Sequence, residues 1–290
     1  MSTLLLLGTG GGDFPALDDP TNDTGNLPRV RQLGGRCLRH AAAAVLQPDI
    51  LIDFYSDRQL TQFGVKAETI RHLLITHGHF DHFQPLAIME VASRLAQPLE
   101  VYGNEMVGQA LEFAATYRWD GELGKFSVRQ TDSNIRFHLI EPGAGERAVG
   151  DAVVTPVLAN HCIDKPMMIA DQRALNYVLE RDGKTVFYGL DSSYTLPRTL
   201  DVLRKFTFDV AVFDATFGDL DIDPAGSGHH NFRMLRETIA EFGDLGLITD
   251  DTTVLASHMS LAHVAPHDDI VEELAREGIV LAYDGMTIDF

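Results

Sequence analysis

Short apolar runs of strand length alternate with segments of helical periodicity along most of the chain. In the first half the pattern predicts strands over residues 4–7, 42–46, 49–53, 73–75 and 99–102, and helices over 85–96 and 105–117. The second half repeats this order, with strands over 152–158, 174–179, 185–190, 208–213 and 253–256, and helices over 197–206, 231–242 and 266–277. Two such halves are expected to pack sheet against sheet, with the helices outside.

Four polar residues follow the apolar run Leu73–Ile75 within a few positions: His77, His79, Asp81 and His82. Two imidazoles separated by one residue can bind one metal ion, and the carboxylate and imidazole on the other side of the turn suit a second ion nearby. Packing gives no reason to group these side chains after a buried strand, where their desolvation is costly unless something ligates them. The spacing therefore predicts a paired metal site.

The segment from His77 to His82 resembles the His-x-His-x-Asp-His signature of the metallo-β-lactamase superfamily. Other landmarks of that family are matched in the same order, each at the end of an apolar run: Asp53, His161, Asp191 and His258. The resemblance covers residues 1–290 and implies an α+β fold, the αββα sandwich, built as one domain.

The resemblance also implies a ligand set for two divalent ions. His77, His79 and His161 would hold the first ion, Asp81, His82 and His258 the second, and Asp191 would bridge them. A hydroxide shared by the ions would be the nucleophile, because coordination lowers the pKa of water from about 16 towards about 7. Zinc and manganese are expected and iron also fits, since histidine and carboxylate ligands suit all three.

A proton donor for the leaving group is sought just before the predicted helix at 231–242, where His229 and His230 are adjacent. His230 is favoured because its position resembles that of a non-ligand histidine in phosphodiesterase branches of the superfamily; an ordinary loop residue is the alternative for either. With Asp191 and Asp81, His230 forms the predicted catalytic group. Asp53 and Asp214 are expected to orient ligand imidazoles, with strand-end capping as the alternative for Asp214.

Other polar residues are weaker candidates. Lys165 could bind an anionic substrate, and Tyr194 and Thr195 could offer it hydroxyl groups. The remaining histidines are assigned structural roles (His40, His72 and His138) or left between pocket lining and helix start (His263 and His267).

Composition narrows the function further. A chain of 290 residues with 45% hydrophobic content can form one large core, and it contains no apolar stretch of membrane-spanning length. The two cysteines, Cys37 and Cys162, are too few for a disulfide framework, so a cytoplasmic location is expected. The net charge of −19 disfavours nucleic acid as a partner and leaves a small anionic substrate held by the metals. A homodimer is compatible with the sequence.

The amino-terminal region bears on the substrate. Gly8–Gly12 is expected to form a tight loop beside the active site, since it lacks the spacing of a dinucleotide fingerprint, and residues 13–35 are expected to form a long loop of the kind that covers active sites. Several segments resemble the phosphoribosyl cyclic phosphodiesterase branch of the carbon-phosphorus lyase pathway: Gly8–Gly11, Arg36-Cys37, the neighbourhood of His258 and Tyr283–Met286. That branch has clustered cysteines for a structural zinc in the loop, whereas residues 13–35 contain none, so no structural zinc is expected.

Three functions remain. The first is a dinuclear metal-dependent phosphodiesterase acting on a small phosphate ester, cyclic ones included. The second keeps fold and metals but hydrolyses a lactone, thioester or amide, because fold does not fix substrate; a tRNA 3′-processing nuclease is disfavoured by the charge. The third is a non-catalytic metal-binding or cofactor-biosynthesis accessory protein, against which the full ligand set argues.

Overall fold

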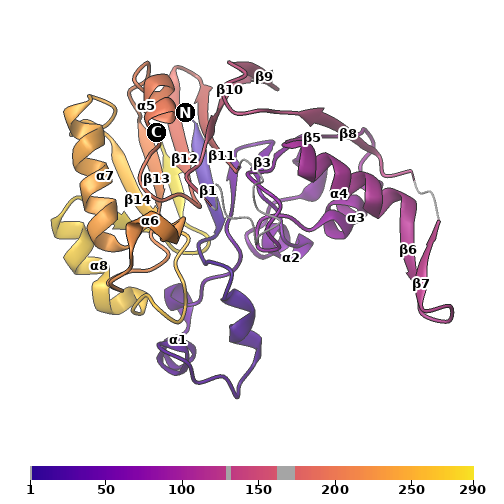
Figure 1. The fold of residues 1–290 in the computed structure, drawn as a ribbon, viewed down its shortest axis with the longest axis horizontal. Helices are drawn as coiled ribbons and strands as arrows, with labels where there is room; N and C mark the ends of the chain where they lie inside the picture. Colours follow the sequence, from indigo (N-terminus) through magenta and orange to yellow (C-terminus); the bar gives the residue numbers. More distant parts are fainter. Residues whose placement is uncertain (1, 129–131, 162–173) are drawn as a thin grey trace.

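Two seven-stranded sheets pack face to face, and helices cover the outer face of each (Figure 1). The computed structural model describes residues 2–128, 132–161 and 174–290. The first sheet has the spatial order β16 (Thr287–Asp289), β1 (Thr3–Gly8), β2 (Ala43–Leu46), β3 (Ile50–Ile52), β4 (His72–Leu74), β5 (Leu99–Gly103) and β8 (Ile135–Leu139). The second has β15 (Ile279–Leu281), β14 (Thr253–Ser257), β13 (Val210–Asp214), β12 (Lys184–Gly189), β11 (Leu175–Arg181), β10 (Ala152–Leu158) and β9 (Arg147–Val149). The αββα sandwich expected from the sequence is confirmed.

Strand β1 shows why these strands are apolar throughout rather than alternating. Leu4 and Leu6 face the second sheet and join the core between the sheets, whereas Leu5 and Leu7 face the helix layer. Side chains alternate between the two faces of a strand, so a strand buried on both faces must be apolar at every position. The same arrangement on the second sheet places aromatic side chains such as Phe187 and Phe213 under the outer helices.

The outer helices form two groups (Figure 1). The helices α3 (Pro85–Ser93) and α4 (Glu105–Thr116) lie on the side of the first sheet, with the short α2 (Asp57–Gln62). The helices α5 (Pro197–Leu203), α7 (Phe232–Asp244) and α8 (His267–Arg276) lie on the side of the second sheet. Their positions confirm the helices predicted from periodicity, within a few residues at each end.

Parallel pairing gives the site its location. In the first sheet β3, β4, β5 and β8 run parallel, and in the second β12, β13, β14 and β15 do. Strand β11 pairs antiparallel with both β10 and β12, so β10 runs in the same direction as β12. The carboxyl ends of these strands therefore meet along one edge of the sandwich, which is where open sheets of this kind bind ligands.

Some elements were not predicted. Residues 13–35 are not one long loop, because they contain the 3₁₀ turn η1 (Phe14–Asp18), the helix α1 (Leu27–Leu33) and the start of η2 (Gly35–Cys37). A hairpin of β6 (Tyr117–Asp120) and β7 (Lys125–Val128) projects from the body of the molecule (Figure 1). The short elements η3 (Ala67–Thr69) and α6 (Pro224–Ser227) were also missed. Among the described residues, no helix combines the length and apolar character needed to span a bilayer.

Candidate metal centre

The predicted ligand side chains converge at the edge where the strands end. The loop after β4 supplies His77, His79, Asp81 and His82, and the ends of β10, β12 and β14 lead to His161, Asp191 and His258. Among the described residues, three overlapping groups have ligand atoms that all lie within 4.8 Å of one another. One of them joins Asp191 and His258 to Asp214 and His229, and the other two consist of predicted ligands alone. Of these two, one group contains His77, His79, His161 and Asp191, and the other contains Asp81, His82 and His258.

Asp191 lies between the two groups and faces each with a different oxygen. Its Oδ1 is 3.9 Å from Nε2 of His77 and 3.7 Å from Nε2 of His161. Its Oδ2 is 2.9 Å from Nε2 of His82 and 3.2 Å from Nε2 of His258. A carboxylate placed in this way can bridge two cations.

Within each group, ring nitrogens of different histidines lie at about hydrogen-bond distance from one another. Nδ1 of His79 is 3.1 Å from Nε2 of His161, and the Nε2 atoms of His82 and His258 are also 3.1 Å apart. Asp81 completes the second group, with its Oδ2 3.5 Å from Nε2 of His258. Nitrogen and oxygen atoms that point at one common space are the donor set of a divalent metal such as zinc or manganese.

The first group shows the fit to a metal most directly. His77 is buried, and among the described residues its Nε2 has no hydrogen-bond partner. A buried polar atom without a partner is unfavourable unless something absent from the protein chain binds it. Burial lowers the pKa of His77 well below its usual value and that of His161 to about 4. Both imidazoles are therefore neutral at neutral pH, which is the form that ligates metals.

The second group has an excess of negative charge. Burial disfavours a charged imidazole, yet the carboxylates of Asp191 and Asp81 raise the pKa of His82 well above its usual value. Burial also disfavours a charged ring at His258. The negative charge of Asp191 and a hydrogen bond to Asp214 outweigh burial and raise the pKa of His258 to about 10. The surroundings thus favour a cation at this position, and a bound metal ion would provide that charge in place of the ring protons.

A second layer of contacts fixes the orientation of the imidazoles. Nδ1 of His82 is 2.7 Å from Oδ2 of Asp53, and Nδ1 of His258 is 2.7 Å from Oγ1 of Thr216. Asp53 is fully buried and also accepts hydrogen bonds from Thr76. Partners of this kind set ring orientation and tautomer in metal sites.

The family model described as the beta-lactamase superfamily domain matches residues 49–272, which is more than half of the chain. This chain belongs to the metallo-β-lactamase superfamily. No curated protein matches its sequence.

Solved structures of other superfamily proteins resemble the fold. A diphosphatase from the PhnP family is 19% identical, with a TM-score of 0.71 and coverage of 100% of this chain and 98% of that one. Zn²⁺-bound PqqB from Methylobacterium extorquens is 15% identical, with a TM-score of 0.71 and coverage of 99% and 100%. The short form of human tRNase Z is 20% identical, with a TM-score of 0.62 and coverage of 99% and 98%. At these identities the likeness concerns the fold alone.

The choice between the two adjacent histidines has to be corrected. The structure does not bring His230 to the metal centre: its Nε2 lies 2.9 Å from Oγ1 of Thr238 in α7, and its side chain is buried. Burial lowers its pKa to about 4. His229 lies at the centre instead, with its ring stacked on that of His258 at a centroid distance of 5.4 Å and an angle of 6°.

His229 is held by Asp214, which ends β13. Its Nδ1 is 2.7 Å from Oδ2 of Asp214, and 17% of its side chain is exposed to solvent. The other oxygen of Asp214 accepts hydrogen bonds from the backbone N–H groups of Thr216 and His230. Asp214 therefore holds both histidines. One carboxylate oxygen contacts the ring of His229 and the other accepts a hydrogen bond from the backbone N–H of His230.

Three residues beside the metal centre adopt a left-handed backbone conformation. Asp53, Asp191 and His258 have φ values of 58°, 48° and 56°. Residues other than glycine take this conformation uncommonly, and aspartate and histidine are among the types that do so most often. Such residues gather at functional sites, where the surrounding structure holds them in place.

The glycine-rich loop after β1 runs beside the second group, as expected from the sequence. A β-carbon added to Gly11 would lie 3.5 Å from the ring of His258, and one added to Gly12 would lie 3.4 Å from Oδ2 of Asp81. Asp13 anchors the loop by accepting hydrogen bonds from the backbone of Leu261 and Ala262. Small residues here let the backbone approach the ligands closely.

The weaker candidates have other surroundings. Lys165 and Cys162 lie outside the described residues. Tyr194 donates a hydrogen bond to Glu237 of α7, and within the described part of the chain neither it nor Thr195 hydrogen-bonds to a predicted ligand. The structural histidines have partners of their own, which are Asp284 for His40, Tyr102 for His72 and Glu100 for His138. His267 is buried at the start of α8, and His263 packs against Phe217.

Proposed function

We propose that the protein is a metal-dependent hydrolase that cleaves a small, anionic phosphodiester, cyclic esters included. The observation that supports this most is the pair formed by His229 and Asp214 at the opening of a two-part ligand cluster. An alkoxide that leaves from phosphorus needs a proton in addition to the metals, and His229 of this pair is the proposed donor.

The metal sites are assigned to the residues of the two groups. We propose that His77, His79 and His161 hold one divalent ion, that Asp81, His82 and His258 hold the other, and that Asp191 contacts both. Zinc or manganese ions bound there would lower the pKa of water and neutralise negative charge on the phosphoryl group. The protein chain itself would hold the ligand side chains in place and would supply a proton from His229.

His229 is the proposed general acid. Its Nδ1 faces the carboxylate of Asp214, so the opposite ring nitrogen, Nε2, is the one available to a substrate. The carboxylate of Asp214 fixes the orientation of this ring. The proton on Nε2 passes to the leaving alkoxide as the P–O bond breaks, and solvent restores it afterwards.

The substrate class follows from charge and site. The net charge of −19 repels long polyanions, whereas a small phosphate ester needs only the metals to neutralise it. The structural likeness to a PhnP-family diphosphatase is consistent with phosphorus chemistry. A lactone, thioester or amide substrate is the alternative, since the same site can activate water against a carbonyl carbon.

The test is metal analysis followed by a substrate panel. Purified protein is loaded with zinc or manganese, its metal content is measured, and hydrolysis of bis(4-nitrophenyl) phosphate, 4-nitrophenyl phosphate, a lactone and a thioester is followed. Preferred turnover of the phosphodiester supports the proposal. Turnover of the lactone or thioester without the phosphodiester supports the alternative, and bound metal without any turnover contradicts both.

A further inference from the structure

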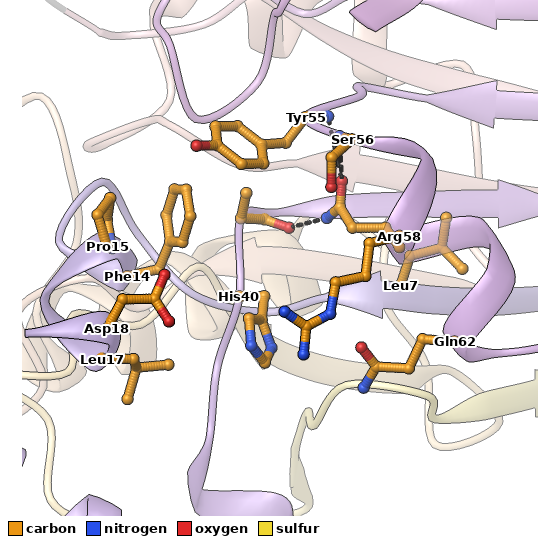
Figure 2. A pocket seen from close by; sticks show the side chains of 12 residues that line it. Leu7, Phe14, Pro15, Leu17, Asp18, His40, Tyr55, Ser56, Arg58 and Gln62 are labelled. Atoms are coloured by element: carbon orange, nitrogen blue, oxygen red, sulfur yellow. Dashed lines mark hydrogen bonds between the residues drawn. The ribbon is translucent and has the colours of Figure 1, made fainter. Parts of the chain in front are cut away.

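A second cavity lies apart from the metal centre, between η1, α2 and the end of β1 (Figure 2). Its volume is about 150 Å³, and its lining contains none of the predicted metal ligands. The residues that matter for what it could bind are Leu7, Phe14, Leu17, Asp18, His40 and Arg58.

Among the residues that line this cavity, Arg58 is the lysine or arginine, and so it carries a permanent positive charge. Within the described part of the chain its guanidinium makes no hydrogen bond or ion pair, and Figure 2 shows it beside His40. The neighbouring Gln59 is fully used, because its Nε2 donates to the carbonyl of Ala41 at 2.6 Å and its Oε1 accepts from the backbone N–H of Tyr55. Arg58 is exposed to solvent as well as lining the cavity. Its guanidinium can bind an anion there, and a carboxylate matches its geometry.

The rest of the cavity favours an apolar group of limited size. Leu7 and Phe14 are buried side chains of its wall, and Leu17 adds apolar surface from η1. An apolar cavity of about 150 Å³ in another protein binds benzene. The volume therefore admits a body of about one aromatic ring.

Asp18 sets the direction in which a ligand would bind. Asp18 and Arg58 line the cavity from different elements, η1 and α2. An anionic group would be repelled from Asp18 and attracted to Arg58, so the ligand has one orientation. We propose that this cavity binds a small aromatic or branched aliphatic carboxylate, with its carboxylate on Arg58 and its apolar body against Phe14 and Leu17.

The proposed binding site adjoins the metal motif through Phe14. The ring of Phe14 stacks on Phe80, between His79 and Asp81, at a centroid distance of 6.1 Å, and meets Tyr55 edge-on at 4.7 Å. A ligand in the cavity would therefore contact the opposite side of an aromatic layer that borders the metal centre. The inference does not depend on the reaction proposed above, because it concerns binding in a separate cavity.

The test is calorimetric titration of the full-length protein with three probes of one size: benzoate, benzyl alcohol and benzylamine. Benzoate is expected to bind tightest. Arg58→Gln should weaken benzoate binding about tenfold or more, because it removes a charge-assisted hydrogen bond. Lys66→Gln is the matched control, since it removes one positive charge near α2 from a residue outside the cavity lining, and it should leave binding unchanged.

A second variant tests the apolar part. Leu17→Trp should fill the cavity and abolish benzoate binding while the melting temperature stays close to that of the wild type. The inference is overturned if the wild type shows no saturable benzoate binding, if benzylamine or benzyl alcohol binds as tightly, or if Arg58→Gln behaves like Lys66→Gln. The last result would also be seen if benzoate bound at the metal centre instead.

Discussion

Replacement of His229 and of His230, each by alanine, should have opposite consequences. His229 faces the opening of the metal centre and is held by Asp214, whereas His230 is packed against α7 and bonded to Thr238. If His229 protonates the leaving group, its loss should lower turnover without much effect on folding. If His230 is structural, its loss should lower stability and leave the turnover of folded protein nearly unchanged.

The magnitudes follow from burial and chemistry. Loss of a general acid lowers rates by about 10²–10⁴-fold, but only where the leaving group needs a proton. A nitrophenolate leaves without one, so His229→Ala should reduce hydrolysis of a methyl or ribosyl ester far more than that of bis(4-nitrophenyl) phosphate. His230→Ala removes a buried ring and its hydrogen bond to Thr238. We expect a loss of about 3 kcal/mol in unfolding free energy, as for other large buried side chains.

The assay is a series of phosphodiesters with leaving groups of increasing pKa, measured with each variant at equal metal content. The wild type should show a shallow dependence of kcat on leaving-group pKa, and His229→Ala a steep one. Urea unfolding of the same preparations gives the stability of each variant. Equal loss on every ester for His229→Ala, or a steep dependence for His230→Ala, would refute the assignment.

Three further predictions concern metal content, stability and pH. Asp191→Ala should lose both ions, whereas His258→Ala should retain one; metal analysis that finds two ions in Asp191→Ala contradicts the bridging role. Tyr177→Phe removes the hydrogen bond from a buried hydroxyl to the carbonyl of Ile75 (2.7 Å) and should cost about 1–2 kcal/mol in urea unfolding with metal content unchanged. The pKa of His230 is lowered to about 4, so its contribution to stability is present above about 6.5 and is lost as pH falls towards 4. His230→Gln should remove about 3 kcal/mol of that acid dependence, and an unchanged pH profile would argue against it.

The sequence predicted the sandwich, and it predicted which side chains meet at one edge of it, because both depend on local patterns. A strand that ends in a polar residue predicts where that residue lies, and parallel strands bring such residues to one edge. The sequence did not distinguish His229 from His230. These neighbours lie in a short connection before α7, and tertiary contacts with Asp214 and Thr238 decide which ring faces the site.

The cavity lined by Phe14 and Arg58 illustrates the same limit over longer distances. Its lining comes from Leu7 at the end of β1, Phe14 in η1 and Arg58 in α2, which are separated in sequence and share no motif. The pattern over residues 13–35 indicated only a loop, because proline, asparagine and glycine obscure the short helices that form there. The segment is placed by long-range contacts such as the packing of Phe14 against Phe80 and Tyr55 and the hydrogen bonds that Asp13 accepts from Leu261 and Ala262.

Backbone strain and electrostatics together explain why a metal would stabilise this fold. Asp53, Asp191 and His258 each hold a left-handed conformation at the point where a strand delivers a side chain to the centre. Within the described residues, the carboxylates of Asp191 and Asp81 raise the pKa values of His82 and His258, so protons on these rings balance the carboxylate charge. A bound ion would replace those protons and form bonds to the strained residues Asp191 and His258. The conformational cost of the turns is then offset in the metal-bound protein, and we expect chelation to lower the melting temperature as well as activity.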